Sequence, residues 1–488
     1  MREKGEAGVI GLAVMGQNLC LNMNDHGYKV IAFNRTWSTV ENFLKGPAKG
    51  TAIVGADSLT SLVNKLKRPR KILLMVRAGE VVDTFVNNLS LLLDEGDIII
   101  DGGNSNYEDT VRRVDMLEKK GILFVGAGIS GGEEGARRGP SIMPGGNPKA
   151  WPEVKELLQD ISARAEDGEP CCDWVGPGGA GHFVKMVHNG IEYGDMQLIS
   201  EAWQFMRDGL KLTNDEMADI FRKWNETELD SYLIEITADI LNYREKESGE
   251  HLIDNILDAA GQKGTGKWTG MDALDKGIPL TLITEAVFAR CISALKEERV
   301  DAARIFEKKI EPVTGDSDQI KAWVEMLREA LLASKIISYA QGFMLMREAS
   351  ETYNWNLNYT QLAKVWRAGC IIRSAFLSDI AEAFTSEPDI PFLGSAPWFR
   401  KQLLGNMDSW RKIVVKSVEI GLPMPAMTSA ITFLDGYTCA SLPANMIQAQ
   451  RDFFGAHTFE RVDKPRGEFF HTDWSGHGGK TSSTTYEA

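Results

Sequence analysis

The amino-acid sequence predicts a doubly wound α/β domain, then a large all-helical domain, then an extended C-terminal tail. Over residues 1–180, short β-rich apolar runs alternate with helical patterns, which is typical of a parallel sheet covered by helices on both faces. From 181 to 440 the periodicity is that of long helices, with few strand signals. Residues 441–488 end in a stretch rich in glycine, serine and threonine, whose composition suits a tail.

Five continuous apolar runs predict the strands of the first domain. They cover residues 8–10, 30–33, 71–76, 97–100 and 122–125. Because these runs are continuous rather than alternating, we expect strands that are buried on both faces.

Two pairs of windows in the helical region resemble each other. Residues 197–202 resemble 344–349, and residues 220–224 resemble 362–366. The two offsets, 147 and 142, differ only by a modest gap, which is consistent with an internal duplication of a helical unit. Short matches between helices also arise by chance.

The tail holds aromatic side chains that water solvates poorly. Phe469, Phe470 and Trp474 lie between polar stretches. Because exposed aromatic rings usually mark a contact surface, we expect the tail to dock on another surface, and a partner subunit is one candidate.

Length and composition exclude several classes of protein. With 488 residues the chain is too long for one compact core. Its 54 basic and 68 acidic residues give a net charge of −14, which argues against nucleic-acid binding but does not exclude local basic pockets. Six scattered cysteines predict reduced thiols, no metal site and a cytoplasmic location. The charged N-terminus and the lack of a run of 18 apolar residues predict neither a signal segment nor a membrane span.

The first predicted strand leads directly into a glycine-rich turn of the dinucleotide-binding type. Gly11 permits the tight turn and Gly16 lets the next helix pack close to the sheet, while Ala13 replaces the usual middle glycine. Backbone amides at the start of that helix would face a pyrophosphate. This motif is common by chance, but its place at the start of a βαβ unit favours a Rossmann-like cofactor domain.

The end of the second predicted strand favours NADP over NAD. NAD-binding domains usually carry an acidic residue there, which bonds the ribose 2′-hydroxyl. This chain instead has Asn34, Arg35 and Thr36, and an arginine can hold a 2′-phosphate. The competing interpretation is an ordinary surface arginine.

Two further turns follow predicted strands of the first domain. Residues 129–132 follow the strand that ends at Val125, and residues 101–105 follow the strand before it. Successive amides in such glycine-rich turns can bind an anion, although either turn could be only a tight connection.

One predicted helix carries a polar face with potential acid and base groups. Lys185, His188, Asn189 and Glu192 share this face, and Lys185 and Glu192 stand about 10 Å apart along the axis. A small hydroxylated molecule could lie between the potential base and the potential acid. A solvated helix face is the competing interpretation, and the glycine-rich approach at 176–181 favours a site.

A second glycine-rich loop, at 261–268, is basic and lies in the helical region. It has a Gly-Lys pair but lacks the spacing and the preceding strand of a nucleoside triphosphate site, which excludes that site. The loop still offers amides, a hydroxyl and ammonium groups to a phosphate. Arg290, Arg451 and His457 are further candidates, although each alone is better explained as a surface or packing residue.

Taken together, these motifs resemble the family of decarboxylating 6-phosphogluconate dehydrogenases. The matching segments are 11–16, 34–36, 129–132, 185–193, 261–268 and 450–457. They follow the order of the family, from about residue 8 to the C-terminus, without a large gap. The resemblance implies a homodimeric, NADP-dependent enzyme of the pentose phosphate pathway that converts 6-phosphogluconate to ribulose 5-phosphate and CO₂.

The resemblance also implies a role for each matching residue. The cofactor would contact Gly11, Leu12, Ala13, Val14, Met15, Gly16, Asn34, Arg35, Thr36, Val76, Arg77, Ala78 and Asn104. Asn104 would also contact the substrate, and the sugar-acid end of the substrate would contact Ser130, Gly131, Gly132, His188 and Asn189. The phosphate end would contact Tyr193, Lys263, Thr265 and Arg290, together with Arg451 and His457 of the other subunit. Arg77 departs from the lysine that the resemblance predicts there.

The chemistry that the resemblance implies needs no metal. Lys185, as general base, would take the 3-hydroxyl proton while C3 gives its hydride to NADP⁺. The resulting 3-keto acid would lose CO₂ because its ketone accepts the electrons. Glu192, as general acid, would then protonate C1. These roles require a lowered pKa for Lys185 and a raised pKa for Glu192.

Two other functions stay open at this point. A related β-hydroxyacid dehydrogenase for an unphosphorylated acid would share the first domain and the lysine. It would not need the duplicated helical half, Lys263 and Thr265, or the tail with Arg451. An inactive NADPH-binding scaffold would be expected to lack Lys185, Asn189 or Glu192, and this chain has all three.

Overall fold

The apolar runs near the N-terminus form a mainly parallel sheet, as predicted. In the computed structural model, which describes residues 4–478 and 482–483, this sheet has the strand order β3-β2-β1-β4-β5-β6-β7-β8. In this order the first six strands, from β3 at the edge to β6, are parallel to one another, whereas β7 runs antiparallel to β6. The strands are β1 Ala7–Ile10, β2 Val30–Phe33, β3 Val54–Ala56, β4 Lys71–Leu74, β5 Ile98–Asp101, β6 Leu123–Ser130, β7 Ser141–Gly146 and β8 Gly176–Pro177.

The sequence predicts five of these strands but not β3, β7 or β8. β3 has only three residues and begins exposed, so it lacks the apolar run of a buried strand. β7 ends in Pro144, Gly145 and Gly146, which are residue types typical of turns. It is nevertheless a strand, because it pairs along Val125–Ser130 of β6. The sheet therefore carries an antiparallel strand that the sequence does not predict.

Helices cover both faces of the sheet and form two apolar cores. One core joins α1, α2, α6 and α7 to side chains such as Val9, and the other joins α3, α4 and α5 to side chains such as Ile10. Successive strand residues thus point to opposite cores, which explains the continuous apolar runs. These helices are α1 Val14–Asp25, α2 Trp37–Lys45, α3 Leu59–Lys65, α4 Glu80–Leu89, α5 Tyr107–Glu118, α6 Gly132–Arg138 and α7 Trp151–Asp160.

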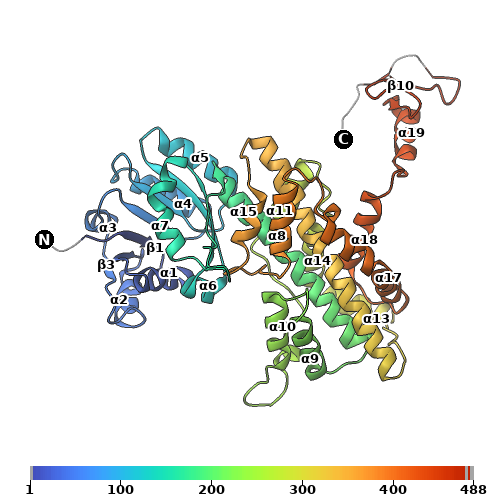
Figure 1. Cartoon of the computed structure of the whole chain (residues 1–488), viewed down its shortest axis with the longest axis horizontal. Helices are drawn as coiled ribbons and strands as arrows, with labels where there is room; N and C mark the ends of the chain where they lie inside the picture. The colour runs from blue at the N-terminus through green and yellow to red at the C-terminus, as the bar shows by residue number, and fades with distance from the viewer. Residues whose placement is uncertain (1–3, 479–481, 484–488) are drawn as a thin grey trace. The chain divides into compact units, whose positions relative to one another are not determined.

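The all-helical region is built around two long helices, α8 and α14, which lie side by side (Figure 1). A buried ion pair joins them, with Lys335 Nζ of α14 2.6 Å from Asp195 Oδ2 of α8. The helices of this region are α8 Ala180–Gln204, α9 Asn214–Trp224, α10 Tyr232–Asn242, α11 Thr265–Asp275, α12 Thr281–Ala294, α13 Lys296–Ile305, α14 Ser317–Tyr353, α15 Tyr359–Val365, α16 Leu377–Ser386 and α17 Pro397–Glu419. Helices α9 and α15 carry the second pair of similar windows, and the duplication stays a prediction.

Helix α8 lies directly against the sheet because glycines remove the side chains between them. A Cβ atom at Gly128 of β6 would overlap Cβ of Lys185. A Cβ atom at Gly181 of α8 would overlap the carbonyl oxygen of Gly126. The sheet therefore holds Lys185 at backbone distance, beside the end of β6.

By its contacts the chain divides into two compact units, Met1–Ala430 and Ile431–Ala488. Helix α18, Pro425–Tyr437, spans this division. The second unit also contains α19, Ala444–Gly455, and a short antiparallel hairpin of β9, Phe459–Glu460, and β10, Phe469–Phe470. The predicted tail thus contains a helix and a hairpin, and much of its terminal polar stretch lies outside the described residues.

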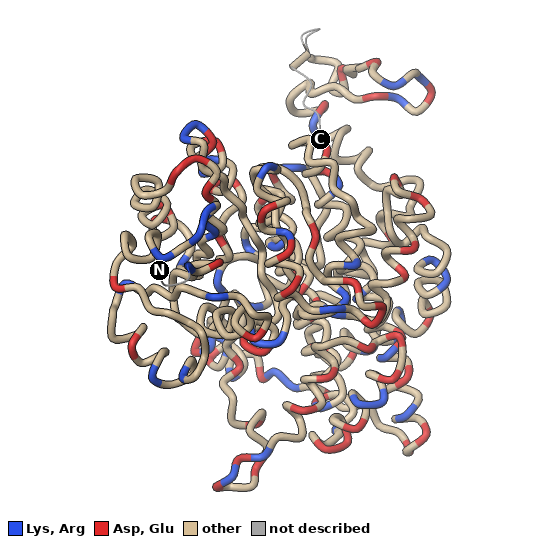
Figure 2. Tube along the Cα trace, turned by 60° about the vertical axis from the view of Figure 1, so that its left-hand side comes forward, with Lys and Arg blue, Asp and Glu red and all other residues tan. Residues whose placement is uncertain are grey.

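Basic and acidic residues are interspersed along the chain rather than gathered into separate blocks (Figure 2). Among the helices of the described residues, none is both long and apolar enough to cross a membrane.

Candidate active site

The predicted cofactor residues follow four strands that are neighbours in the sheet. The glycine turn follows β1, residues 34–36 follow β2, residues 76–78 follow β4 and Asn104 follows β5. Because the order is β2-β1-β4-β5 and these strands are parallel, all four segments lie at the carboxyl edge. The strands before β4 in sequence extend the sheet to one side of β1, and those from β4 onwards extend it to the other side. Doubly wound sheets bind dinucleotides at this point of reversal.

The glycine turn has the conformation that a dinucleotide cradle requires. Gly11 has a φ of +99°, and a Cβ atom at Gly16 would overlap the carbonyl oxygen of Gly11. The Asn34 side chain braces the turn, since its Oδ1 accepts a hydrogen bond from the Leu12 N–H at 3.2 Å. No side chain caps the N-terminus of α1, so its first amides are available to a phosphate.

The polar side chains around this cradle point away from the core. Arg35, Arg77 and Asn104 are all exposed. An exposed arginine directly after β2 fits a ribose 2′-phosphate, and no acidic residue takes its place among Asn34, Arg35 and Thr36. The residues present therefore fit NADP.

A buried network beneath Asn104 was not predicted. Asp101 at the end of β5 accepts a hydrogen bond from Ser105 Oγ at 2.6 Å, and its carboxylate lies 3.5 Å from Arg113 Nη1. His182 of α8 contacts the Asp101 carbonyl oxygen through Nε2 at 3.1 Å. These residues fix the loop that carries Asn104 against the helix that carries Lys185. In the sequence, the one indication that Asp101 anchors this loop is its position at the end of an apolar run.

The predicted polar face of α8 forms one connected cluster in the structure. Lys185 Nζ donates to Asn189 Oδ1 at 2.8 Å and lies 3.2 Å from His188 Nδ1. Ser130 Oγ contacts His188 Nε2 at 3.1 Å, which joins the turn after β6 to the helix. Glu192 Oε2 lies 3.9 Å from His188 Nδ1. The solvated-face interpretation is wrong, because Lys185, His188 and Asn189 are buried.

Burial shifts the pKa values of this cluster in the directions that acid–base catalysis needs. Desolvation lowers the pKa of Lys185, although the charge of Glu192 opposes the shift. Desolvation and the neighbouring Lys185 lower the pKa of His188 well below its usual value. Desolvation raises the pKa of Glu192, against the charges of Lys185 and Arg290. Burial therefore shifts both Lys185 and Glu192 towards their neutral forms.

The loop between α15 and α16 packs against the same cluster. The Ile371 N–H lies 3.5 Å from Ser130 Oγ, and a Cβ atom at Gly131 would lie 2.5 Å from the Gly369 carbonyl oxygen. Cys370, between them, is buried near Lys185. This loop was not predicted from the sequence, because the loop carries no recognisable binding motif. Its one distinguishing feature in the sequence is that it follows the second of the two similar windows, at 362–366.

The residues predicted for the phosphate end also come together. The Arg290 guanidinium lies 3.5 Å from the centre of the Tyr193 ring, and its Nη1 donates to the Gly261 carbonyl oxygen at 3.2 Å. Thr265 is the first residue of α11, which packs against Tyr193. Lys263 is exposed in the same loop. Tyr193 directly follows Glu192 on α8, so the acid–base face adjoins a basic, glycine-rich loop.

Arg451 and His457 belong to the second unit, Ile431–Ala488. Arg451 Nη1 donates to Gln448 Oε1 at 3.0 Å within α19. His457 follows the end of that helix.

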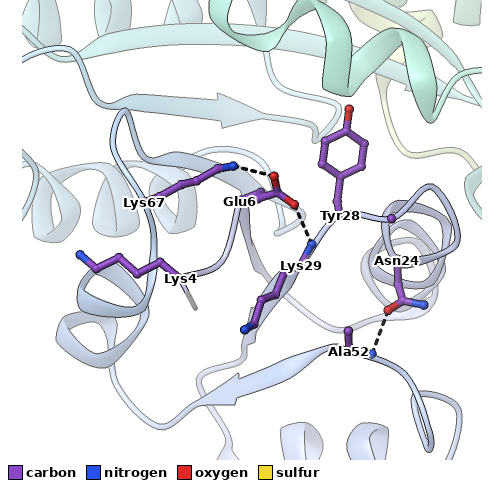
Figure 3. A pocket seen from close by; sticks show the side chains of 8 residues that line it. Lys4, Glu6, Asn24, Tyr28, Lys29, Ala52 and Lys67 are labelled. Carbon is purple, nitrogen blue, oxygen red and sulfur yellow. Dashed lines mark hydrogen bonds and ion pairs between the residues drawn. The ribbon is translucent and has the colours of Figure 1, made fainter. Parts of the chain in front are cut away.

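A separate pocket of about 550 Å³ lies at the opposite edge of the sheet (Figure 3). Its lining includes Glu6, Tyr28 and Lys67, which precede β1, β2 and β4. Glu6 bonds Lys67 Nζ at 2.6 Å and the backbone N–H of Lys29 at 3.1 Å. None of the predicted site residues lines this pocket.

Comparisons with known proteins identify a single family over nearly the whole chain. The NAD binding domain of 6-phosphogluconate dehydrogenase matches residues 6–176, and the C-terminal domain of 6-phosphogluconate dehydrogenase matches residues 181–474. The decarboxylating 6-phosphogluconate dehydrogenase of Aggregatibacter actinomycetemcomitans is 66% identical over 487 residues, which cover 100% of both chains. That of Homo sapiens is 58% identical and covers 99% of this chain and 100% of its own.

A solved structure gives the same result. The 6-phosphogluconate dehydrogenase of Plasmodium falciparum, known in its apo form and in complexes with its cofactor NADP⁺ and its substrate 6-phosphogluconate, is 42% identical. The TM-score is 0.92, and the match covers 96% of this chain and 100% of that chain. The resemblance inferred from the motifs is confirmed: this chain belongs to the family of decarboxylating 6-phosphogluconate dehydrogenases.

Proposed function

We propose that this chain oxidises 6-phospho-D-gluconate with NADP⁺ and releases ribulose 5-phosphate and CO₂. The observation that carries this proposal is the buried cluster on α8. Its lysine is desolvated and held by Asn189 at 2.8 Å, and its glutamate lies two turns further along the helix. Family membership supports the same reaction.

Lys185 acts as the general base and Glu192 as the general acid. A neutral amine takes the proton of the 3-hydroxyl group, and the lowered pKa of Lys185 favours that form. When bound, NADP⁺ accepts the hydride from C3. Loss of CO₂ leaves an enediol, and Glu192 donates a proton to its C1. Desolvation raises the pKa of Glu192, which favours the protonated carboxyl that this step needs.

The remaining residues hold the two ends of the substrate. Ser130, His188 and Asn189 bind the sugar-acid end, together with Gly131 and Gly132, and Asn104 contacts both cofactor and substrate. At the other end, Tyr193, Lys263, Thr265 and Arg290 bind the phosphate. The basic loop at 261–268 favours this phosphorylated acid over the unphosphorylated acids of related β-hydroxyacid dehydrogenases.

The enzyme acts as a cytoplasmic homodimer in which Arg451 and His457 reach the substrate phosphate of the partner subunit. The exposed apolar side chains of the helical region support an oligomer. Phe288, Ile292, Ile305 and Phe306, on and next to α12 and α13, are each more than half exposed.

The test follows absorbance at 340 nm with NADP⁺ and 6-phosphogluconate, with CO₂ release measured in parallel. Lys185→Met should abolish NADPH formation and retain NADPH binding, because the base is lost while the cradle is intact. Lys223→Met, at an exposed lysine of α9, is the control and should keep full activity. Near-normal turnover by Lys185→Met would refute the assignment, and no absorbance change in the parent would favour a scaffold.

A further inference from the structure

The second unit contains a fully buried carboxylate, Asp452, which directly follows Arg451 on α19. A buried charge is costly unless polar groups compensate it. Its partners are the Thr458 N–H at 3.0 Å, His471 Nδ1 at 2.9 Å, the Thr472 N–H at 3.0 Å and Trp474 Nε1 at 2.8 Å. The Asp452 side chain thus links the end of α19 to Thr458, before the hairpin, and to residues 471–474, after the hairpin.

The turn next to Asp452 has an unfavourable backbone conformation. Ala456 has a φ of +51° and Thr458 a φ of +59°, so left-handed residues stand on both sides of His457. A Cβ atom disfavours this region, and a β-branched side chain disfavours it most. Such conformations persist where the surroundings impose them, and they gather at functional sites.

Asp452 and Gln448 impose this conformation. The Asp452 carbonyl oxygen accepts from the Ala456 N–H at 2.9 Å, and its carboxylate accepts from the Thr458 N–H at 3.0 Å. Gln448 Nε2 donates to the Thr458 carbonyl oxygen at 2.5 Å, while Gln448 Oε1 accepts from Arg451 Nη1 at 3.0 Å. The same network therefore holds Arg451 and both neighbours of His457.

We propose that Asp452 is a positioning residue of the substrate site. It fixes the left-handed turn that presents His457 and holds the helix end that carries Arg451. This inference rests on the proposed function, in which Arg451 and His457 bind the phosphate of 6-phosphogluconate. Asp452 itself touches neither substrate nor cofactor, because its oxygens are occupied by the four donors within its own unit.

Asp452→Asn in the full-length enzyme tests this role. The amide keeps the shape of the carboxylate but replaces one acceptor oxygen with an NH₂ group. That NH₂ group would face one or more of the four groups that now donate hydrogen bonds to Asp452, so those hydrogen bonds would be lost. We expect the KM for 6-phosphogluconate to rise roughly tenfold or more. A change of this size corresponds to the loss of one modest charged hydrogen bond to the substrate phosphate. The KM for NADP⁺ should change less than about twofold, because the cofactor cradle lies in the first unit.

Asp463→Asn is the matched control. Asp463 lies in the same hairpin region, but its pair with Arg461 at 2.7 Å is exposed. The KM values of this variant should stay within about twofold of the parent. An unchanged KM for 6-phosphogluconate in Asp452→Asn, or an equal rise in Asp463→Asn, would overturn the proposal.

Trp474→Phe covers the case in which Asp452→Asn does not fold. It removes one N–H donor to Asp452 and keeps an aromatic ring against Phe453 and Phe459. We expect a smaller rise in the KM for 6-phosphogluconate, with an unchanged circular dichroism spectrum and an unchanged KM for NADP⁺. A parental KM for 6-phosphogluconate in this folded variant would overturn the proposal.

Mixed dimers separate this inference from the proposed sharing of the site. A dimer of one Asp452→Asn chain and one Lys185→Met chain has a single working base, on the Asp452→Asn chain. If the tails act across subunits, the intact tail serves that base and the parental KM returns. If the KM stays raised, the tail acts within its own chain: the positioning role of Asp452 stands and the shared site fails.

Discussion

The buried pair of Lys335 and Asp195 gives a sharp prediction for stability. Their side chains are 0% and 1% exposed, and Nζ lies 2.6 Å from Oδ2. Lys335→Met keeps most of the apolar length, but among the residues that the structure describes it leaves the carboxylate with only the Tyr339 hydroxyl, at 3.4 Å. Removing one partner of a buried pair costs about 3–5 kcal/mol, because the other charge stays buried and uncompensated.

This cost converts into a shift of the melting temperature. At about 2.1 cal/mol/K per residue, a cooperative unit spanning Met1–Ala430 has an unfolding entropy of roughly 0.9 kcal/mol/K. The melting temperature of Lys335→Met should therefore fall by about 3–6 °C at pH 8.

The pH dependence of the shift has a definite sign. Burial already raises the pKa of Asp195, and Lys335 opposes that rise. Without Lys335 the pKa rises further, so the carboxyl becomes neutral on acidification and the penalty shrinks as the pH falls through that value. Differential scanning calorimetry at pH 8 and pH 6 measures this. The double variant Lys335→Met/Asp195→Asn should regain at least half of the loss, since no buried charge is left.

Two results would refute this reasoning. One is a melting temperature of Lys335→Met within about 1 °C of the parent at pH 8, against the shift expected from a broken buried pair. The other is a double variant as unstable as Lys335→Met alone, which would assign the loss to packing rather than to the unpaired charge.

Two further predictions concern catalysis. Arg35→Ala should lower the ratio of kcat/KM with NADP⁺ to kcat/KM with NAD⁺ by roughly 10- to 100-fold, since a charged hydrogen bond contributes about 1.5–3 kcal/mol. Steady-state kinetics with both cofactors measure this ratio. An unchanged ratio would mean that Arg35 does not bind the 2′-phosphate. Glu192→Gln should lower kcat by about 10²- to 10⁴-fold. Because the acid must be protonated, the parent loses activity as the pH rises through the raised pKa of Glu192, and a pH–rate profile of the variant should lack that alkaline fall; a retained alkaline fall would assign it to another group.

The sequence predicted those features that depend on local pattern. The glycine turn at 11–16 and the face from Lys185 to Glu192 both follow from spacing along one element. The structure places them where that spacing requires. The roles of the site residues stay predictions, because they came from the family resemblance and depend on bound ligands.

Features that depend on distant partners were not predictable in the same way. β7 contains a proline and two glycines, and it becomes a strand only because β6 offers it hydrogen-bond partners. The pairing of Asp195 with Lys335 joins residues 140 positions apart. Likewise, no local pattern brings the loop around Cys370 to Ser130.

The glycine contact between β6 and α8 limits how this enzyme can change. Since Gly128 faces Lys185 and Gly181 faces Gly126, the base sits at a distance set by two backbones rather than by side-chain size. Substitutions that enlarge these positions would push the helix off the sheet instead of adjusting the site. New substrate preferences, whether evolved or engineered, are therefore expected to arise in the surrounding loops, at 261–268 and 369–371, while the spacing between Lys185 and the sheet is inherited unchanged.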